Sequence, residues 1–252
     1  MKKIATPLML AMSLAFVGNA FAQTAPAAPE STLSFNAGAV NEYRYRGISQ
    51  SRLEPALQGG ADYADKSGAY VGIWGSSIKW IGDAGGKAQK EVDIYGGYKF
   101  AVGDVGYDVG FLRYEYAGNA LPISTNTNEL YGAATLGPVT LKYSRSTGNL
   151  FGFANSKGSS YLDMTATFDL GDGYSLAPHM GYQSVKGAGN SIYSYTDYAL
   201  TFAKDMGNGL SASAAVIGTD AKTDSYYYAA SPTAAHKQLG KAGVVVGIKY
   251  SF

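Results

Sequence analysis

The sequence contains no cysteine and has few charged residues of either sign. Without cysteine, disulfides, thiolate metal sites and a lipid anchor on a modified cysteine are all excluded. Charged residues make up 15% of the chain and leave a formal net charge of +1, which gives no strongly basic or acidic surface for a partner such as nucleic acid. An exported protein without cysteine needs a stabilising device other than disulfides, and a closed, hydrogen-bonded β-barrel would serve.

Long hydrophobic runs are also missing. The chain begins with the basic residues Lys2 and Lys3, continues with a short apolar segment at 8–17, and then carries the cleavage pattern Ala20-Phe21-Ala22. This arrangement is typical of a secretory signal peptide, so we expect the first 22 residues to be removed on export, leaving 23–31 as a flexible N-terminal segment. No later run of eighteen apolar residues remains, which excludes a transmembrane helix.

Tyrosine and glycine are abundant instead, with 21 and 33 copies, and this composition favours strands and tight turns. Between 160 and 170, Leu162, Met164 and Phe168 alternate with the polar Asp163 and Thr165. In a strand these two sets point to opposite faces. The same alternation recurs in segments of about ten residues, as expected for strands that cross a membrane. It is clearest at 90–100, 195–204 and 243–252.

We predict an all-β transmembrane antiparallel up-and-down barrel of about twelve strands occupying residues 32–252. Its connections alternate between short turns with glycine, proline, aspartate or asparagine and longer loops, as in bacterial barrels with short periplasmic turns and long extracellular loops. The predicted strands are 32–45, 55–64, 69–78, 90–100, 105–116, 128–136, 139–146, 160–170, 174–184, 195–204, 209–219 and 243–252.

Aromatic residues gather near the predicted strand ends, where their amphipathic rings suit the two membrane interfaces. One residue interrupts the apolar face of strand 105–116, because Arg113 has the same parity as Val109 and Phe111. Either Arg113 lies beyond the hydrocarbon or a bulge changes the register. The expected loop-side girdle consists of Tyr43, Tyr45, Trp80 and Tyr116, and the turn-side girdle of Phe100, Tyr107, Phe168, Tyr174, Phe202, Tyr250 and Phe252.

Two stretches, 45–50 (YRGISQ) and 55–63 (PALQGGADY), resemble the opening of the TorF family of porins, and 72–76 (GIWGS) and 91–98 (EVDIYGGY) continue the match. The resemblance implies an outer-membrane β-barrel that acts as a porin. The terminal Phe252 resembles the C-terminal signal that the barrel-assembly machinery reads, which implies that machinery as a partner.

If the apolar sets face lipid, the opposite sets line the lumen, and the cost of burying their charges in hydrocarbon requires a wet or paired interior. A barrel of this size leaves a narrow passage, so we expect passive diffusion of small hydrophilic solutes, with no catalysis and no cofactor. Glu42 and Arg44 could lie near Arg46 at the mouth and form a constriction. The candidate lumen residues are Glu42, Arg44, Arg46, Asp62, Glu91, Asp93, Lys142, Asp163 and Asp197.

Three alternatives remain open from the sequence. The lumen charges could form a closed network that makes the barrel rigid and non-conducting. The long loop 220–242 could contact a partner, as in an adhesive barrel, or fold inward as a plug. A hydrolase would need His179 or His236, and neither has an identifiable nucleophile or orienting partner along the chain.

Overall fold

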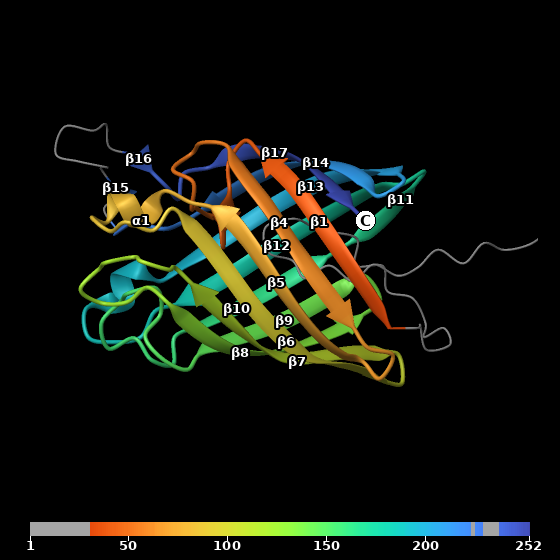
Figure 1. The fold of residues 1–252 in the computed structure, drawn as a ribbon, viewed down its shortest axis with the longest axis horizontal. Helices are drawn as coiled ribbons and strands as arrows, with labels where there is room; N and C mark the ends of the chain where they lie inside the picture. Colours follow the sequence, from red (N-terminus) through yellow and green to blue (C-terminus); the bar gives the residue numbers. More distant parts are fainter. Residues whose placement is uncertain (1–30, 223–224, 229–236) are drawn as a thin grey trace, which may run out of the picture.

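The computed structural model describes residues 31–222, 225–228 and 237–252. The predicted signal peptide, most of the flexible segment 23–31 and His236 lie outside this part of the chain. Within it, antiparallel strands wrap into one barrel, with the long loops at one end and the tight turns and C-terminus at the other (Figure 1). No helix in the described residues is long and apolar enough to cross a membrane.

The barrel is closed and twelve-stranded, because β1 pairs with β4 on one side and with β17 on the other. Its wall consists of β1 (Thr32–Val40), β4 (Ala56–Ala64), β5 (Ala69–Ser77), β6 (Lys90–Val102), β7 (Val105–Glu115), β8 (Thr127–Leu136), β9 (Val139–Ser146), β10 (Ser160–Ala166) continued by β11 (Phe168–Gly171), β12 (Tyr174–Ser184), β13 (Tyr195–Gly207), β14 (Leu210–Thr219) and β17 (Gly243–Ser251).

Small elements lie in the long loops, at the end of the barrel opposite the C-terminus. They are β2 (Arg44–Tyr45), β3 (Ile48–Ser49), the single-turn helix α1 (Trp80–Asp83), the 3₁₀ turn η1 (Asn190–Tyr193), β15 (Tyr227–Tyr228) and β16 (Lys237–Gln238). The β2–β3 and β15–β16 pairs form separate two-stranded sheets. The loop end of the barrel is therefore covered, whereas the turn end consists of tight hairpins.

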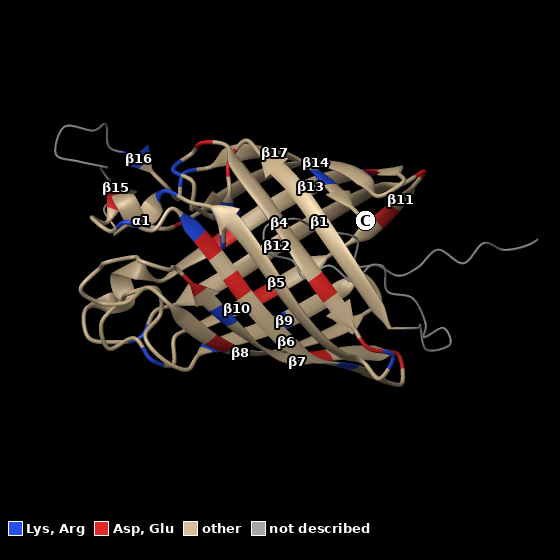
Figure 2. Cartoon of the chain, viewed as in Figure 1, with Lys and Arg blue, Asp and Glu red and all other residues tan. Residues whose placement is uncertain are grey.

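The predicted partition of side chains is confirmed. On β13, Leu200 is 49% exposed on the outer surface while its neighbour Thr201 and the nearby Asp197 are buried inside. On β17, Val244 and Val246 are exposed, and Val245 between them is buried. Figure 2 shows that most of the wall carries no charge. A contiguous apolar surface around a closed sheet suits hydrocarbon, since no strand edge is left unpaired.

Two predicted strands differ from those observed. The strand predicted at 32–45 leaves the wall after Val40, and the chain then folds inward through β2 and β3. The strand predicted at 160–170 is interrupted at Thr167, whose N–H bonds to the Pro138 carbonyl oxygen at 2.8 Å. Alternation continues through Thr167 in the sequence, so the pattern contained no sign of that break, whereas Val40 and Asn41 interrupt the alternation where the first strand ends.

The two expected girdles have different outcomes. At the turn end, rings stack on the outer surface, as in Phe100 with Tyr107 and Tyr174 with Phe202. The loop-side prediction was wrong, because Tyr43 and Tyr116 are fully buried inside the barrel, and Tyr45 and Trp80 pack against the same core. Tyr43, Tyr45 and Tyr116 have hydrogen-bond partners within the barrel, and Trp80 packs against Tyr116, so the four rings belong to its internal core at this end.

The Arg113 ambiguity is resolved against a bulge. The β6–β7 and β7–β8 ladders run through Arg113 without a register shift. Arg113 therefore lies on the outer face close to the loop end of β7, where its guanidinium pairs with Glu115 and bonds to Asn128 at 3.2 Å. A paired arginine near the end of a strand is compatible with the membrane interface.

Candidate functional site

The loop end of the lumen is occupied by residues 41–54, which we call the plug. Its β2–β3 hairpin turns at Arg46 and Gly47, whose φ angles are +48° and +76°. Two positive φ values in a two-residue turn are typical of a type I′ hairpin, which favours glycine. A Cβ at Gly47 would lie 2.5 Å from Thr219 Cγ2 and 2.8 Å from Asp197 Cβ, so the hairpin tip rests directly on the inner wall.

A buried ion pair lies within the plug, and its arginine also connects the plug to the neighbouring loop. Arg44 Nε lies 2.8 Å from Glu42 Oε1, and both side chains are almost completely buried. The Arg44 guanidinium also donates to the carbonyl oxygens of Gly47 at 3.1 Å and Lys241 at 2.7 Å. Because this pair is buried, removal of either partner would leave an uncompensated charge. The plug is thus a fixed part of the barrel.

Arg46 spans the interior from the plug to the far wall. Its guanidinium forms a two-pronged ion pair with Glu129 of β8, at 2.8 and 3.1 Å, and donates to Gln183 Oε1 of β12 at 2.7 Å. It also lies 4.3 Å from the Tyr161 ring centroid. The side chains of Arg46 and Glu129 are 6% and 1% exposed. We call Arg46, Glu129 and Gln183 the constriction.

Two further carboxylates lie on β6 beside the constriction. Glu91 accepts hydrogen bonds from Tyr43 at 2.7 Å and Tyr116 at 2.8 Å. Asp93 is 0% exposed, and among the described residues neither of its carboxylate oxygens has a hydrogen-bond partner. An unpaired buried carboxylate is costly unless water or a cation reaches it. Asp93 is therefore an uncompensated carboxylate of the inner wall in the described part of the chain. Other buried polar atoms without a partner in the described chain are Trp80 Nε1, Thr125 Oγ1 and Ser146 Oγ.

Tyrosines cross-link the lumen towards the turn end. Tyr95 donates to Asp62 at 2.5 Å, and the Tyr70 hydroxyl donates to Asp108 at 2.6 Å and also contacts the Tyr131 hydroxyl. These rings fit against glycines on adjacent strands; a Cβ at Gly72, for example, would lie 2.3 Å from the Tyr95 ring. Lys142 Nζ lies 4.1 Å from the centroid of the Tyr131 ring. The inner wall is therefore polar but partly filled by aromatic rings.

His179 of β12 lies between two lumen carboxylates. Its Nε2 is 2.9 Å from Asp197 Oδ1, and its Nδ1 is 3.5 Å from Asp163 Oδ2 and 3.1 Å from Thr165 Oγ1. A hydroxyl, a histidine and a carboxylate are thus in contact, which the sequence did not reveal. Thr165 also donates to Asp163, and β10 is paired on both sides, so its N–H groups are engaged in the sheet and provide no oxyanion donors. We interpret the group as a charged network of the lumen wall.

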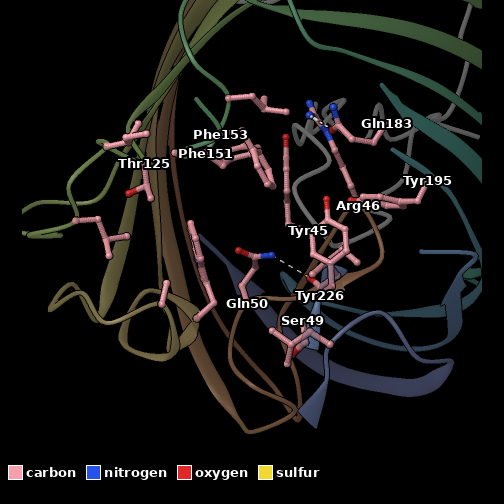
Figure 3. Close-up of a pocket in the computed structure, with 18 of the residues that line it drawn as sticks. Tyr45, Arg46, Ser49, Gln50, Thr125, Phe151, Phe153, Gln183, Tyr195 and Tyr226 are labelled. Atoms are coloured by element: carbon pink, nitrogen blue, oxygen red, sulfur yellow. Dashed lines mark hydrogen bonds between the residues drawn. The ribbon is translucent and has the colours of Figure 1, made fainter. Parts of the chain in front are cut away.

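Outside the constriction lies a cavity of about 350 Å³, here called the mouth cavity. Figure 3 shows aromatic side chains surrounding it, with Arg46 and Gln183 at its inner side and Gln50 reaching in from the plug. Its described lining residues are mostly apolar and come from the plug, the loops and the ends of β12 and β13. They include Tyr45, Trp80, Leu121, Phe151, Phe153, Tyr195, Tyr226 and Leu239.

A solvent-exposed group of ion pairs between Glu54, Lys79 and Lys237, which we call the clasp, connects the loops around the mouth. Glu54 of the plug bonds to Lys79 and lies 3.2 Å from Lys237 Nζ. The Lys79 ammonium, together with Lys237, holds the pKa of the Glu54 carboxyl below its ordinary value. Lys237 Nζ also donates to the Arg52 carbonyl oxygen at 3.1 Å. The clasp adds a second connection between the plug and the loop that follows β14.

A model of one protein family, described as a bacterial protein of unknown function (Gcw_chp), matches residues 23–252. The chain belongs to this family. A comparison of the Gcw_chp chain with curated proteins gave no match.

Solved porin structures resemble the Gcw_chp barrel. The KdgM porin has a TM-score of 0.53 and 10% sequence identity, covering 88% of this chain and 99% of the porin. KdgM in complex with disordered oligogalacturonate has a TM-score of 0.54 and 10% identity, with the same coverage. The NanC porin has a TM-score of 0.52 and 11% identity, again covering 88% and 99%. At such low identities, the similarity establishes the fold alone.

The structure places every candidate lumen residue of the Gcw_chp chain on the inner wall or in the plug. Glu42, Arg44 and Arg46 lie in the plug, where Arg44 pairs with Glu42 whereas Arg46 pairs with Glu129 of β8, and Glu91, Asp93 and Asp197 are buried on the inner wall. Asp62, Lys142 and Asp163 lie further towards the turn end, among or beside the tyrosine cross-links. In the described residues, no group of three or more histidines, aspartates or glutamates is arranged to hold a metal ion.

Two inward residues of the site, Glu129 and Gln183, and the contact of His179 with Asp197 were not predicted from the sequence. Alternation could have found Glu129, because it opposes the outward Leu130 on its strand. Gln183 could have been assigned inward in the same way. The contact between His179 and Asp197 depends on the β12–β13 pairing, which no single segment reveals.

Proposed function

We propose that this Gcw_chp protein is an outer-membrane channel through which small hydrophilic solutes diffuse passively along a narrow polar lumen. The observation that supports this most strongly is the inner wall itself: charged and hydroxylated side chains line a closed barrel whose outer surface is apolar. Such an interior is suited to hydrated solutes, and selectivity then depends on lumen charge and width. The resemblance of the fold to KdgM and NanC agrees with this proposal.

In this proposal, the constriction is the narrowest point of the pathway. Arg46 reaches across the interior to Glu129 and Gln183, so a solute must pass beside this side chain or displace it. Asp93 is fully buried beside it and has no partner in the described chain, so in this proposal lumen water reaches its carboxylate and keeps it negatively charged. The pathway then favours cations over anions of the same size.

A second candidate is a non-conducting structural barrel. The hydrogen bonds between Tyr70 and Tyr131, and between Tyr45 and Tyr114, connect side chains across the interior and favour a filled lumen. In this case the same network serves only to make the barrel rigid. An adhesive role for the loop 220–242 has less support, because Leu239 of that loop packs into the core beside Ile48.

The proposed location is the bacterial outer membrane, with lipid against the apolar surface. We also propose that the signal peptide directs export, that the barrel-assembly machinery reads the terminal Phe252, and that the chain groups with the TorF porins. The Phe252 ring stacks on Phe35 of β1 at 5.7 Å between ring centroids, so the C-terminus lies at the seam where the barrel closes. A signal at the closing seam is accessible until the last strand has paired.

Purified protein inserted in a planar lipid bilayer is expected to give discrete current steps with a preference for cations. Asp93→Asn should lower that preference, and Lys142→Gln should raise it, because each changes the charge of the inner wall. The reversal potential in a salt gradient measures both changes. Glu115→Gln is the matched control, since Glu115 lies on the outer face and pairs with Arg113.

Unchanged reversal potentials in both lumen variants would remove these residues from the pathway. Bilayers without current steps would favour the non-conducting barrel, provided that the mobility of the unboiled protein on a gel shows that it is folded.

A further inference from the structure

The mouth cavity has a lining that differs from the rest of the interior. Inside the constriction, the wall carries carboxylates, lysines and tyrosine hydroxyls, whereas the cavity is bounded mainly by rings and aliphatic side chains. Its volume of about 350 Å³ lies at the lower end of the range for small-molecule sites, which are typically concave and apolar with a few placed polar groups. A rigid ring of one or two cycles is the shape that such a space accepts.

The charge of the lining indicates a neutral occupant. Arg46 is the one formally charged residue among the described residues that line the cavity, and Glu129 neutralises it through a two-pronged ion pair. No lining carboxylate is present in the described part of the chain to balance a ligand cation. A ligand anion would have to compete with Glu129 for Arg46. A neutral molecule needs no balancing carboxylate and does not compete with Glu129 for Arg46.

Three residues that line the cavity have a polar atom without a hydrogen-bond partner in the described chain: Trp80 Nε1 and Thr125 Oγ1, which are buried, and Gln50 Oε1. Gln50 is only 9% exposed, and its Nε2 donates to the Ile48 carbonyl oxygen at 3.1 Å, which fixes the orientation of the amide. Its Oε1 has no hydrogen-bond partner among the described residues and is directed towards the cavity (Figure 3). The amide oxygen can only accept, so its partner must donate. Hydroxyls carried on an aromatic ring satisfy this requirement together with the apolar walls.

We propose that the mouth cavity is a binding site for neutral phenols. The ring packs among Tyr45, Phe151 and Trp80, and the phenolic hydroxyl donates to Gln50 Oε1. Aromatic walls contribute stacking and edge-to-face contacts, and the hydroxyl provides the specificity. A phenol bound here lies directly outside the constriction, so the site deepens the proposed function. Any role of the site in transport rests on that proposed function. Binding itself is independent of current.

The probe pair is 4-ethylphenol and its methyl ether, 4-ethylanisole, which share the ring but differ in the donor hydrogen. Isothermal titration into protein in lipid nanodiscs, with empty nanodiscs as reference for partitioning, measures the two affinities. The phenol is expected to bind about tenfold more tightly, because the ether leaves the Gln50 oxygen without a partner. Benzylamine and glucose, a cationic ring and a hydrophilic non-aromatic molecule, should bind at least as weakly as the ether.

The two tryptophans of the chain report where the probe binds. Trp80 lines the cavity, whereas Trp74 lies on β5 within the barrel and packs against Tyr43. In protein labelled with ¹⁵N-tryptophan, and assigned with Trp74→Phe, 4-ethylphenol should shift the Trp80 indole resonance and leave that of Trp74 in place. Gln50→Met should reduce phenol binding about fivefold and leave ether binding unchanged. Gln58→Met, on β4 outside the cavity, is the matched control and should alter neither.

Equal affinities for phenol and ether would overturn the proposal in favour of an unspecific apolar space. A shift at Trp74 alone, or glucose binding as strong as phenol binding, would overturn it by placing binding elsewhere. Because titration and resonance shifts need no ion flow, a silent bilayer would contradict the channel without contradicting this site, and the reverse also holds.

Discussion

Arg46→Ala is expected to raise the unitary conductance several-fold and to destabilise the barrel at the same time. The substitution removes the side chain that crosses the lumen, so the pathway widens where it is narrowest. It also leaves Glu129, which is 1% exposed, without its ion-pair partner. Loss of one partner of a buried pair costs about 3–5 kcal/mol. Single-channel recording measures the first effect, and urea unfolding in lipid vesicles measures the second.

The matched control for Arg46 is Arg113→Ala. Arg113 lies at the same end of the barrel but on its outer face, and it also pairs with a glutamate. Its removal should leave conductance unchanged and cost no more than about 1 kcal/mol, as for other exposed pairs. If Arg46→Ala conducts like the wild type, Arg46 does not limit the pathway.

Leu200→Arg is expected to lower the free energy of unfolding by about 2–4 kcal/mol, the cost of an arginine on the lipid face near the bilayer midplane. Leu200 is in the middle of β13, and its side chain is on the outer surface. In a soluble protein, the same change at a half-exposed position would have little effect. Urea unfolding in lipid vesicles therefore also tests whether this surface contacts hydrocarbon.

Ser213→Arg is the control for Leu200, because Ser213 pairs with Ala203 on the adjacent β13 but faces the interior. A lumen substitution should change ion selectivity and leave the unfolding free energy within about 0.5 kcal/mol of the wild type. An equal loss of unfolding free energy in the two variants would mean that the outer and inner surfaces contact the same kind of solvent.

Period-two alternation and turn chemistry were sufficient to predict the wall. On β13 and β17 each side chain was assigned to the correct face, because one neighbour meets an apolar environment and the next a polar one. The break at Thr167 and the inward turn after Val40 were not predicted. Both depend on contacts with distant segments, such as the Thr167 bond to Pro138 and the seat of Gly47 against Thr219.

The candidate site was predicted in composition but only partly in arrangement. Arg46 was expected to lie near Glu42 and Arg44, whereas its observed partners, Glu129 and Gln183, come from strands on the opposite wall. The aromatic residues predicted as a loop-side girdle form the inner core instead. Amphipathic rings suit both a membrane interface and a polar interior, so position along the strand cannot separate the two.

The chain has no native cysteine, so a spin label can be placed on single cysteines at each of positions 198–203 in turn. Electron paramagnetic resonance in lipid vesicles then compares the accessibility of each label to oxygen, which concentrates in hydrocarbon, and to a water-soluble nickel complex. Labels at 198, 200 and 202 should be relaxed mainly by oxygen, and labels at 199, 201 and 203 mainly by nickel if water fills the lumen. Similar accessibility at all six positions would contradict a barrel with lipid outside and a polar pathway within. Relaxation mainly by oxygen at both the even-numbered and the odd-numbered positions would contradict it as well.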